Sequence, residues 1–292
     1  MPLLVALEPA DQHDMYTAGT VASMARAGVA GDESRALTPD DDHSPLVRVR
    51  KRLATTQYGR RALGSLHGVA TDEPVFGVTF DDGPNPDVTP RVLDLLTERG
   101  STATFFMPAA RALAHPELAR EVAARGNEVG VHGFEHTRIT ELGWGGVRNE
   151  TTRARSELGR IVGTKPHWFR PPYGAQNIRT FLATRLQGMD VAVWSVDPSD
   201  SMTTSGFEVT SVEPGLVTLH AAGKEISLAA GSILLLHDTP AADDLHDGAT
   251  RKIALIERLL DGIRSSGGRT VTLSELLRQG VADRRIWRSP GY

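Results

Sequence analysis

The segment VFGVTFDDGP, residues 75–84, decides the fold class of this chain. Its first six residues are almost all apolar, and a short continuous apolar run predicts a strand that is buried on both faces. Asp81 and Asp82 follow the run, and Gly83-Pro84 then turns the chain. Two adjacent carboxylates at the end of a buried strand are costly unless something cationic holds them, so a cationic partner is expected nearby.

Short apolar segments alternate with amphipathic stretches over the rest of residues 72–280. Further strands are expected at residues 102–106, 128–131, 167–169, 191–195, 232–236 and 269–272. Helices are expected at residues 88–99, 116–125, 147–162, 176–185, 250–265 and 273–278. This alternation predicts an α/β fold in which helices cover a parallel sheet of about seven strands. The pattern leaves an α/β barrel and a doubly wound sheet both open.

Residues 201–230 interrupt the alternation because they contain no amphipathic helix. Two short strand-like segments, residues 217–221 and 224–228, flank Ala222-Gly223. This arrangement predicts a hairpin inserted on the surface of the domain.

The two ends of the chain differ from the central part in charge. Residues 1–44 carry eight acidic and two basic residues, a net charge of −6, and are predicted to be a mobile acidic segment. Residues 45–71 carry six basic and no acidic residues, a net charge of +6. They are predicted to form a solvated helix, with peripheral membrane contact through residues 45–61 as the alternative. We therefore interpret residues 1–71 as an N-terminal arm, 72–280 as the central domain and 281–292 as a basic C-terminal tail.

Composition and length exclude several classes of protein. The 292 residues include no cysteine, which excludes disulfides, thiolate metal sites and a cysteine nucleophile. The net charge of −4 gives no reason to expect nucleic acid as a partner. The N-terminal apolar run is too short for a secretory signal, and no segment has the length of a transmembrane helix, so a cytoplasmic location is expected.

Polar side chains follow the predicted strands at the points where each strand ends. In parallel α/β folds these carboxyl ends meet at one edge of the sheet, where active sites lie. Two histidines and one carboxylate give a divalent metal three ligands and leave room for water, while a second carboxylate and a further histidine can act as base and acid. The sequence therefore has the groups for metal-assisted hydrolysis. They are Asp81, Asp82, His132, His136, Arg170, Asp197, Asp200 and His237.

Five motifs in this order resemble those of the polysaccharide deacetylases, carbohydrate esterase family 4, also called the NodB-homology domain. They are TFDDGP at 79–84, HGFEH at 132–136, RPPY at 170–173, DPSD at 197–200 and LLHD at 235–238. The resemblance covers about residues 74–278. It implies a distorted (β/α) barrel and a metal-dependent hydrolase that removes the acetyl group from an N-acetylated sugar.

The resemblance also implies a role for each motif residue. One divalent metal, zinc or else cobalt or nickel, would be held by Asp82, His132 and His136. Asp81 would be the catalytic base, and Arg170 would orient it and keep it ionised.

The later motifs would supply the acid and the substrate contacts. His237 would protonate the departing amine, and Asp200 would position His237. Pro171, Tyr173 and Leu235 would contact substrate, with Leu235 lining an acetyl pocket and the Tyr173 backbone N–H stabilising the oxyanion.

Two positions depart from the family pattern. Gly133 stands where Ser or Thr is common, which removes a hydroxyl beside the metal ligands. Ser201 stands where a sugar-stacking Trp is common, so a remodelled substrate groove is expected. Removal of an O-acetyl group, hydrolysis of another non-peptide amide and a non-catalytic carbohydrate-binding role remain alternatives.

Overall fold

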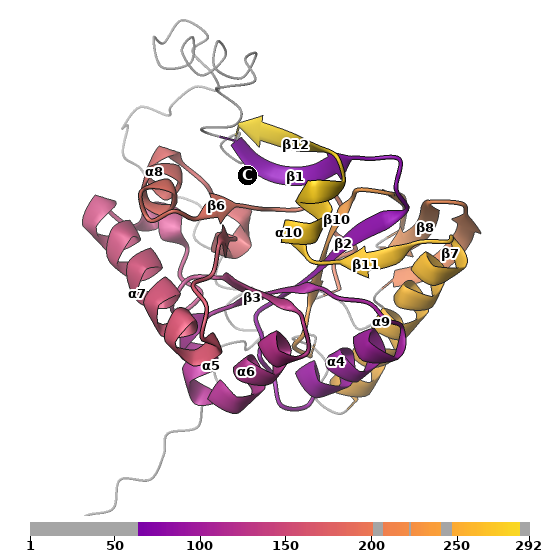
Figure 1. The fold of residues 1–292 in the computed structure, drawn as a ribbon, viewed down its shortest axis with the longest axis horizontal. Coiled ribbons are helices and arrows are strands. Elements are labelled where there is room, and N and C mark those ends of the chain that lie inside the picture. The colour runs from indigo at the N-terminus through magenta and orange to yellow at the C-terminus, as the bar shows by residue number, and fades with distance from the viewer. Residues whose placement is uncertain (1–63, 201–206, 222, 241–246, 287–292) are drawn as a thin grey trace, which may run out of the picture. The chain divides into compact units, whose positions relative to one another are not determined.

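Seven parallel strands form a curled sheet in the order β10-β2-β3-β4-β5-β6, with β11 beside β2 (Figure 1). The structure is a computed structural model that describes residues 64–200, 207–221, 223–240 and 247–286. The strands are β2 (Val75–Asp81), β3 (Thr104–Met107), β4 (Glu128–Val131), β5 (Trp168–Phe169), β6 (Asp190–Val191), β10 (Ile233–His237) and β11 (Arg269–Val271).

The sheet closes on itself just beyond β6. Val196 forms a parallel bridge with Leu234 of β10, and the Leu235 N–H donates to the Val196 carbonyl at 3.0 Å. The two ends of the strand order therefore meet, and the fold is a distorted barrel rather than an open doubly wound sheet.

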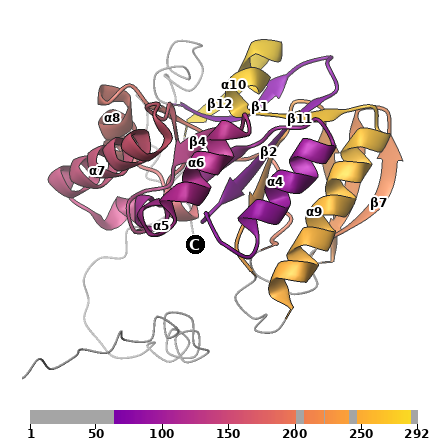
Figure 2. The same cartoon turned by 60° about the horizontal axis from the view of Figure 1, so that its bottom comes forward.

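Helices surround the outer face of the sheet (Figures 1 and 2). They are α4 (Thr89–Glu98), α5 (Ala109–Ala114), α6 (Pro116–Ala124), α7 (Trp144–Val162), α8 (Ile178–Leu186) and α9 (Gly248–Ser265). The other helical segments are the short helix α10 (Leu273–Leu276) and the 3-10 turns η2 (Ile139–Glu141), η3 (Pro172–Gly174) and η4 (Leu277–Gln279). The amphipathic pattern explains the packing of the helices on the outer face. In α9, Ile256, Leu259 and Ile263 recur at three- and four-residue spacing and are buried in the main core.

The two-residue period of β2 separates an inner from an outer face. Phe76, Val78 and Phe80 lie in the core beneath the helices. A Cβ on Gly77 would instead meet Leu273 and Leu276 of α10, which plugs one end of the barrel interior. Because side chains alternate along a strand, Asp81 shares the inner face with Gly77.

Two strands lie outside the boundaries that the sequence suggests for the central domain. β1 (Gly64–Ala70) pairs antiparallel with β12 (Val281–Ile286), at the top of Figure 1. Leu66 bridges Ala192 and is fully buried, so this pair is attached to the barrel. Short strands whose partners lie more than 200 residues apart leave little periodic signal in sequence, which is why 64–70 and 281–286 were assigned to the arm and the tail.

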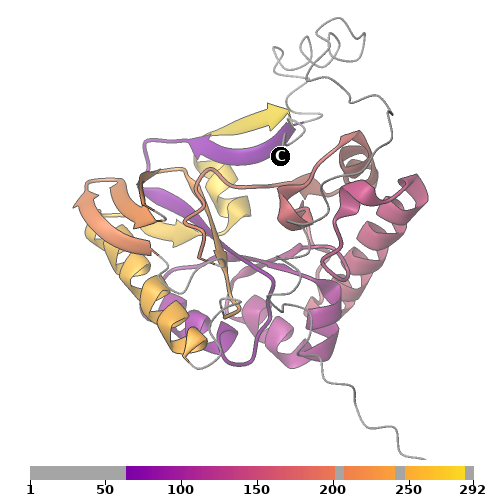
Figure 3. The same cartoon turned by 180° about the vertical axis from the view of Figure 1, so that it is seen from behind.

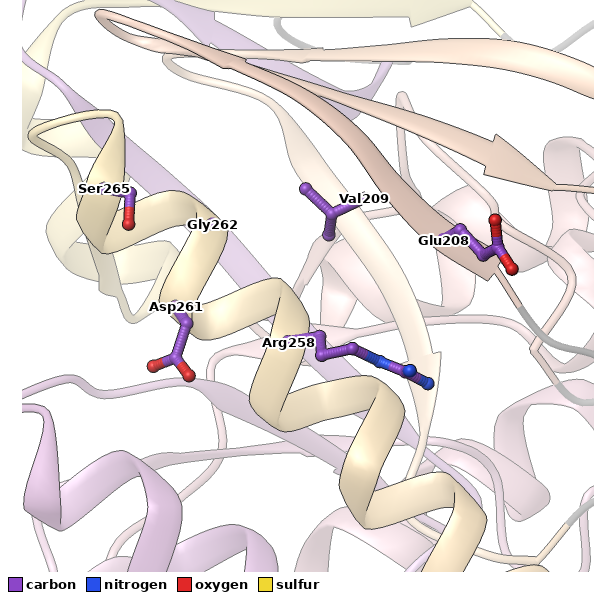
Figure 4. A pocket seen from close by; sticks show the side chains of 6 residues that line it. All are labelled: Glu208, Val209, Arg258, Asp261, Gly262 and Ser265. Atoms are coloured by element: carbon purple, nitrogen blue, oxygen red, sulfur yellow. The ribbon is translucent and has the colours of Figure 1, made fainter.

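The insert forms a three-stranded antiparallel sheet of β7 (Phe207–Glu213), β8 (Leu216–Ala221) and β9 (Lys224–Ala229), which Figure 3 shows from behind. The hairpin expected from the sequence is confirmed as β8 and β9, and β7 is an additional strand. The sheet packs on α9, and a surface pocket of about 420 Å³ lies between β7 and α9 (Figure 4). None of the motif residues lines this pocket.

The acidic segment, the basic segment at 45–61 and Ser201 lie outside the described residues, as does the end of the tail. Among the helices that are described, none combines the length and the apolar character needed to cross a bilayer.

Candidate active site at the carboxyl end of the barrel

The carboxyl ends of four strands carry the predicted site residues to one end of the barrel. Asp81 ends β2 and is the register partner of His237, which ends β10. His132 directly follows β4, and Arg170 directly follows β5. Since the strands are parallel and these positions face inward, the side chains converge.

Asp82, His132 and His136 form a compact group of potential metal ligands. Their nearest ligand atoms all lie within 4.8 Å of one another. The Asp82 Oδ1 atom is 3.2 Å from Nε2 of His136 and 3.6 Å from Nε2 of His132. Asp82 and His136 adopt left-handed φ values of 72° and 58°, and these conformations direct both side chains.

This group fits a divalent cation. Asp82 Oδ1 is buried and has no hydrogen-bond partner among the described residues, which suits an oxygen that coordinates a metal. The His132 Nδ1–H donates to the Arg170 carbonyl at 2.8 Å, which leaves the Nε2 lone pair facing Asp82. Burial lowers the pKa of His132 to about 3, so its imidazole is neutral, as a metal ligand must be.

Asp81 and Arg170 form a buried ion pair beside the metal-ligand group. Arg170 is fully buried, and its Nη1 donates to Asp81 Oδ1 and to Thr79 Oγ1, both at 2.7 Å. Its Nη2 donates to the Val193 carbonyl at 2.9 Å, and its guanidinium lies 4.1 Å from the Phe106 ring centroid. Burial raises the pKa of the Asp81 carboxyl, and the Arg170 charge opposes that rise.

His237 and Asp200 form a second hydrogen-bonded pair. Nδ1–H of His237 donates to Asp200 Oδ1 at 2.8 Å, and the His237 backbone N–H donates to Oδ2 at 3.0 Å. Burial would lower the pKa of His237, but the hydrogen bond and charge of Asp200 outweigh it and raise that pKa to about 9. His237 is therefore protonated at neutral pH and able to act as an acid.

The predicted substrate-binding residues lie around these groups. Tyr173 has φ of 60° and is 53% exposed, and its ring packs edge-on against His136 at 4.6 Å between centroids. Pro171 precedes η3 and Leu235 lies in the inward-facing register of β10, where it is 5% exposed.

The structure also brings to the site two residues that sequence reasoning missed. Lys252 of α9 donates to Asp200 Oδ2 at 2.7 Å. Glu150 of α7 accepts from the backbone N–H groups of Phe134 and Glu135 at 2.8 and 3.3 Å, and so holds the loop between the two histidines. Gly133 in this loop has φ of 78°, a conformation that suits glycine better than Ser or Thr. No local motif marks either contact, because each joins a helix to a loop distant in sequence.

Comparison with known proteins identifies a family and several relatives. The family model "Polysaccharide deacetylase" matches residues 68–192. A peptidoglycan-N-acetylglucosamine deacetylase of Bacillus cereus is 32% identical over 72% of this chain and 91% of its own length. A chitooligosaccharide deacetylase of Azorhizobium caulinodans is 29% identical over 70% and 95% of the two chains.

A solved structure gives the same result for the fold. The family 4 carbohydrate esterase of Streptomyces lividans, in complex with acetate, superposes with a TM-score of 0.57 at 26% identity, over 74% of this chain and 98% of that one. The motifs, the barrel and the relatives all lead to one assignment: this chain belongs to the polysaccharide deacetylase family.

Proposed function

We propose that this protein is a metal-dependent N-deacetylase that hydrolyses the acetamide of an N-acetylated sugar to acetate and a free amine. The observation that carries the proposal is the convergence of three groups at one barrel end: the Asp82–His132–His136 cluster, the Asp81–Arg170 pair and the His237–Asp200 pair. The similar deacetylases named above act on N-acetylglucosamine-containing polymers and oligosaccharides, and this class is our proposal for the substrate.

Asp82, His132 and His136 would hold the metal, for which zinc is our proposal because one carboxylate and two imidazoles are a typical catalytic zinc set. A divalent cation bound there supplies Lewis-acid polarisation of the amide carbonyl and makes water more acidic. The His132–Arg170 carbonyl hydrogen bond would fix the orientation of the imidazole toward it.

Asp81 would take a proton from the attacking water. Arg170 holds one Asp81 oxygen at 2.7 Å, which fixes the carboxylate while the other oxygen lies on the side of His132. The backbone N–H of Tyr173 would stabilise the oxyanion that forms as water adds to the carbonyl carbon.

His237 would then give its proton to the amide nitrogen as the C–N bond breaks. An amine is a poor leaving group unless it is protonated, so an amide substrate needs this acid. The elevated pKa of His237, about 9, keeps the imidazole charged at neutral pH before the transfer. Leu235 would shape the pocket for the acetyl methyl group.

The proposal is tested by acetate release from N-acetylated sugars ranging from N-acetylglucosamine through chitooligosaccharides to peptidoglycan, with zinc added. We expect release by the wild type and a loss of about 10²–10⁴-fold in Asp81→Asn. Asp87→Asn is the matched control, because Asp87 is an exposed carboxylate six residues away. Absence of acetate from every sugar, or wild-type rates in Asp81→Asn, would contradict the proposal.

A second variant separates the amide from the ester alternative. His237→Ala should lose about 10²–10⁴-fold on an N-acetyl sugar, because the amine leaves only when protonated. An alkoxide leaves more readily, so an O-acetyl ester substrate should be affected much less. Comparable rates of wild type and His237→Ala on the best substrate would favour ester hydrolysis.

A further inference from the structure

A buried lysine lies behind the His237–Asp200 pair. Lys252, one of four lysines in the chain, lies near the N-terminal end of α9 and is 3% exposed. Its Nζ donates to Asp200 Oδ2 and to the Asp200 backbone carbonyl, both at 2.7 Å. Lysine is rarely buried unless it is paired, so this contact accounts for its position in the core.

Both oxygens of the Asp200 carboxylate are engaged. Oδ1 accepts from His237 Nδ1, while Oδ2 accepts from the His237 backbone N–H and from Lys252. The carboxylate, 1% exposed, therefore cannot rotate without breaking several charge-assisted hydrogen bonds. Because Nδ1 is used in this way, Nε2 is the His237 atom that can reach a substrate.

We infer that Lys252 is a positioning residue that fixes the Asp200 carboxylate and, by its charge, eases release of the His237 proton. This inference rests on the proposed function, in which His237 is the acid. With Asp200 alone, release of that proton would leave a buried carboxylate without a cation. With Lys252 in contact, release leaves a neutral Asp200–Lys252 pair, which costs less in a buried site.

The carboxylates around His237 have the opposite effect to Lys252, because they favour the protonated imidazole. Asp81 and Asp82 at the end of β2 and Asp197 in the loop before Asp200 all favour the charged imidazole. Arg170 is already paired with Asp81. Within the described residues, Lys252 is the side-chain cation besides His237 that hydrogen-bonds to Asp200. Removing it should therefore make His237 a weaker acid.

The test is an NMR titration of the His237 imidazole in the protein supplied with zinc chloride. Lys252→Gln keeps a hydrogen-bond donor without the charge, and Lys252→Arg keeps the charge. We expect the His237 pKa to rise by about one unit in Lys252→Gln and to stay near the wild-type value in Lys252→Arg. Lys224→Gln is the matched control, because Lys224 is exposed in β9.

Steady-state kinetics provide a second readout. Lys252→Gln should lower kcat at pH 7 by about 10-fold with little change in KM, since Lys252 is buried behind Asp200 and affects only the proton donor. An unchanged or lower His237 pKa in Lys252→Gln would overturn the inference, whatever the stability of the variant.

If Lys252→Gln does not fold, a measurement on the wild-type protein still tests the role of Lys252. The Lys252 side-chain resonances should shift as His237 titrates, because both side chains contact the Asp200 carboxylate. Lys252 resonances that do not change as His237 titrates would overturn the inference. Both NMR measurements are independent of turnover, so a protein that lacks deacetylase activity would refute the proposed function without deciding the role of Lys252.

Discussion

Replacement of Arg170 by methionine removes the cation that pairs with the buried carboxylate of Asp81. Asp81 and Arg170 are 3% and 0% exposed, and Nη1 lies 2.7 Å from Oδ1. Loss of one partner of such a pair destabilises a protein by about 3–5 kcal/mol, because the remaining charge stays buried. Methionine fills part of the space beside Phe106 but gives no hydrogen bond.

The loss of stability in Arg170→Met should depend on pH, in a direction that is set by the protonation of Asp81. Burial already raises the pKa of Asp81 in the folded wild type, and without Arg170 it rises further. A folded pKa above the unfolded value means that the folded state binds more protons, so stability falls as the pH rises above about 4. Each unit by which the pKa of Asp81 in the folded variant exceeds its value in the unfolded chain corresponds to about 1.4 kcal/mol of stability lost as the pH rises through that range.

Urea denaturation of wild type and Arg170→Met at pH 4 and pH 7, with chelator present, measures this difference. We expect the variant to be closest to wild type at pH 4. The double variant Asp81→Asn/Arg170→Met should recover much of the loss at pH 7, because no buried charge remains. Arg125→Met is the control, since Arg125 pairs with Asp94 and Glu121 at the surface and should matter far less. The reasoning would be refuted if Arg170→Met lost the same free energy of unfolding at pH 4 and pH 7. It would also be refuted if the losses of the two single variants simply added in the double variant.

Three further predictions concern the site. His136→Gln should weaken zinc binding by at least about 10-fold in calorimetric titration and reduce acetate release, whereas wild type treated with chelator should recover activity when zinc is returned; equal zinc affinity in the two proteins would contradict the ligand assignment. Asp200→Asn should lower the His237 pKa from about 9, so the alkaline limb of the pH profile of kcat/KM should move to lower pH, and an unmoved limb would exclude His237 as its origin. Gly133→Ser should lower the free energy of unfolding by about 1–2 kcal/mol in urea, because φ at this position is 78°, and a more stable variant would contradict this.

The parts of the fold that were predicted correctly are those whose signal is local. The apolar run at 75–80 predicts β2 because a strand covered on both faces has no polar positions, and the alternation around it predicts the helices. β1 and β12 were missed because their strands become regular only by pairing with each other. The seven-strand count was correct, but the choice between an open and a closed sheet depended on the bridge between Val196 and Leu234.

In the candidate site, too, some residues carry a local sequence signal and others depend on long-range contacts. Its motif residues are predicted from the order of short motifs, each confined to a few positions. Lys252 and Glu150 carry no such signal, because a lysine or a glutamate on an amphipathic helix is normally solvated. They are recognised as parts of the site only from their hydrogen bonds to Asp200 and to the 134–135 loop.

The sequence alone determined the α/β class, the family resemblance and the set of acids, imidazoles and guanidinium available for catalysis, because residue type and local periodicity are properties of the chain itself. Tertiary structure decided which atoms meet. Curling of the sheet brings Asp81 and His237 into register, left-handed φ values direct Asp82 and His136, and α9 places a buried cation behind Asp200. These contacts depend on long-range pairing and packing, which no local pattern encodes.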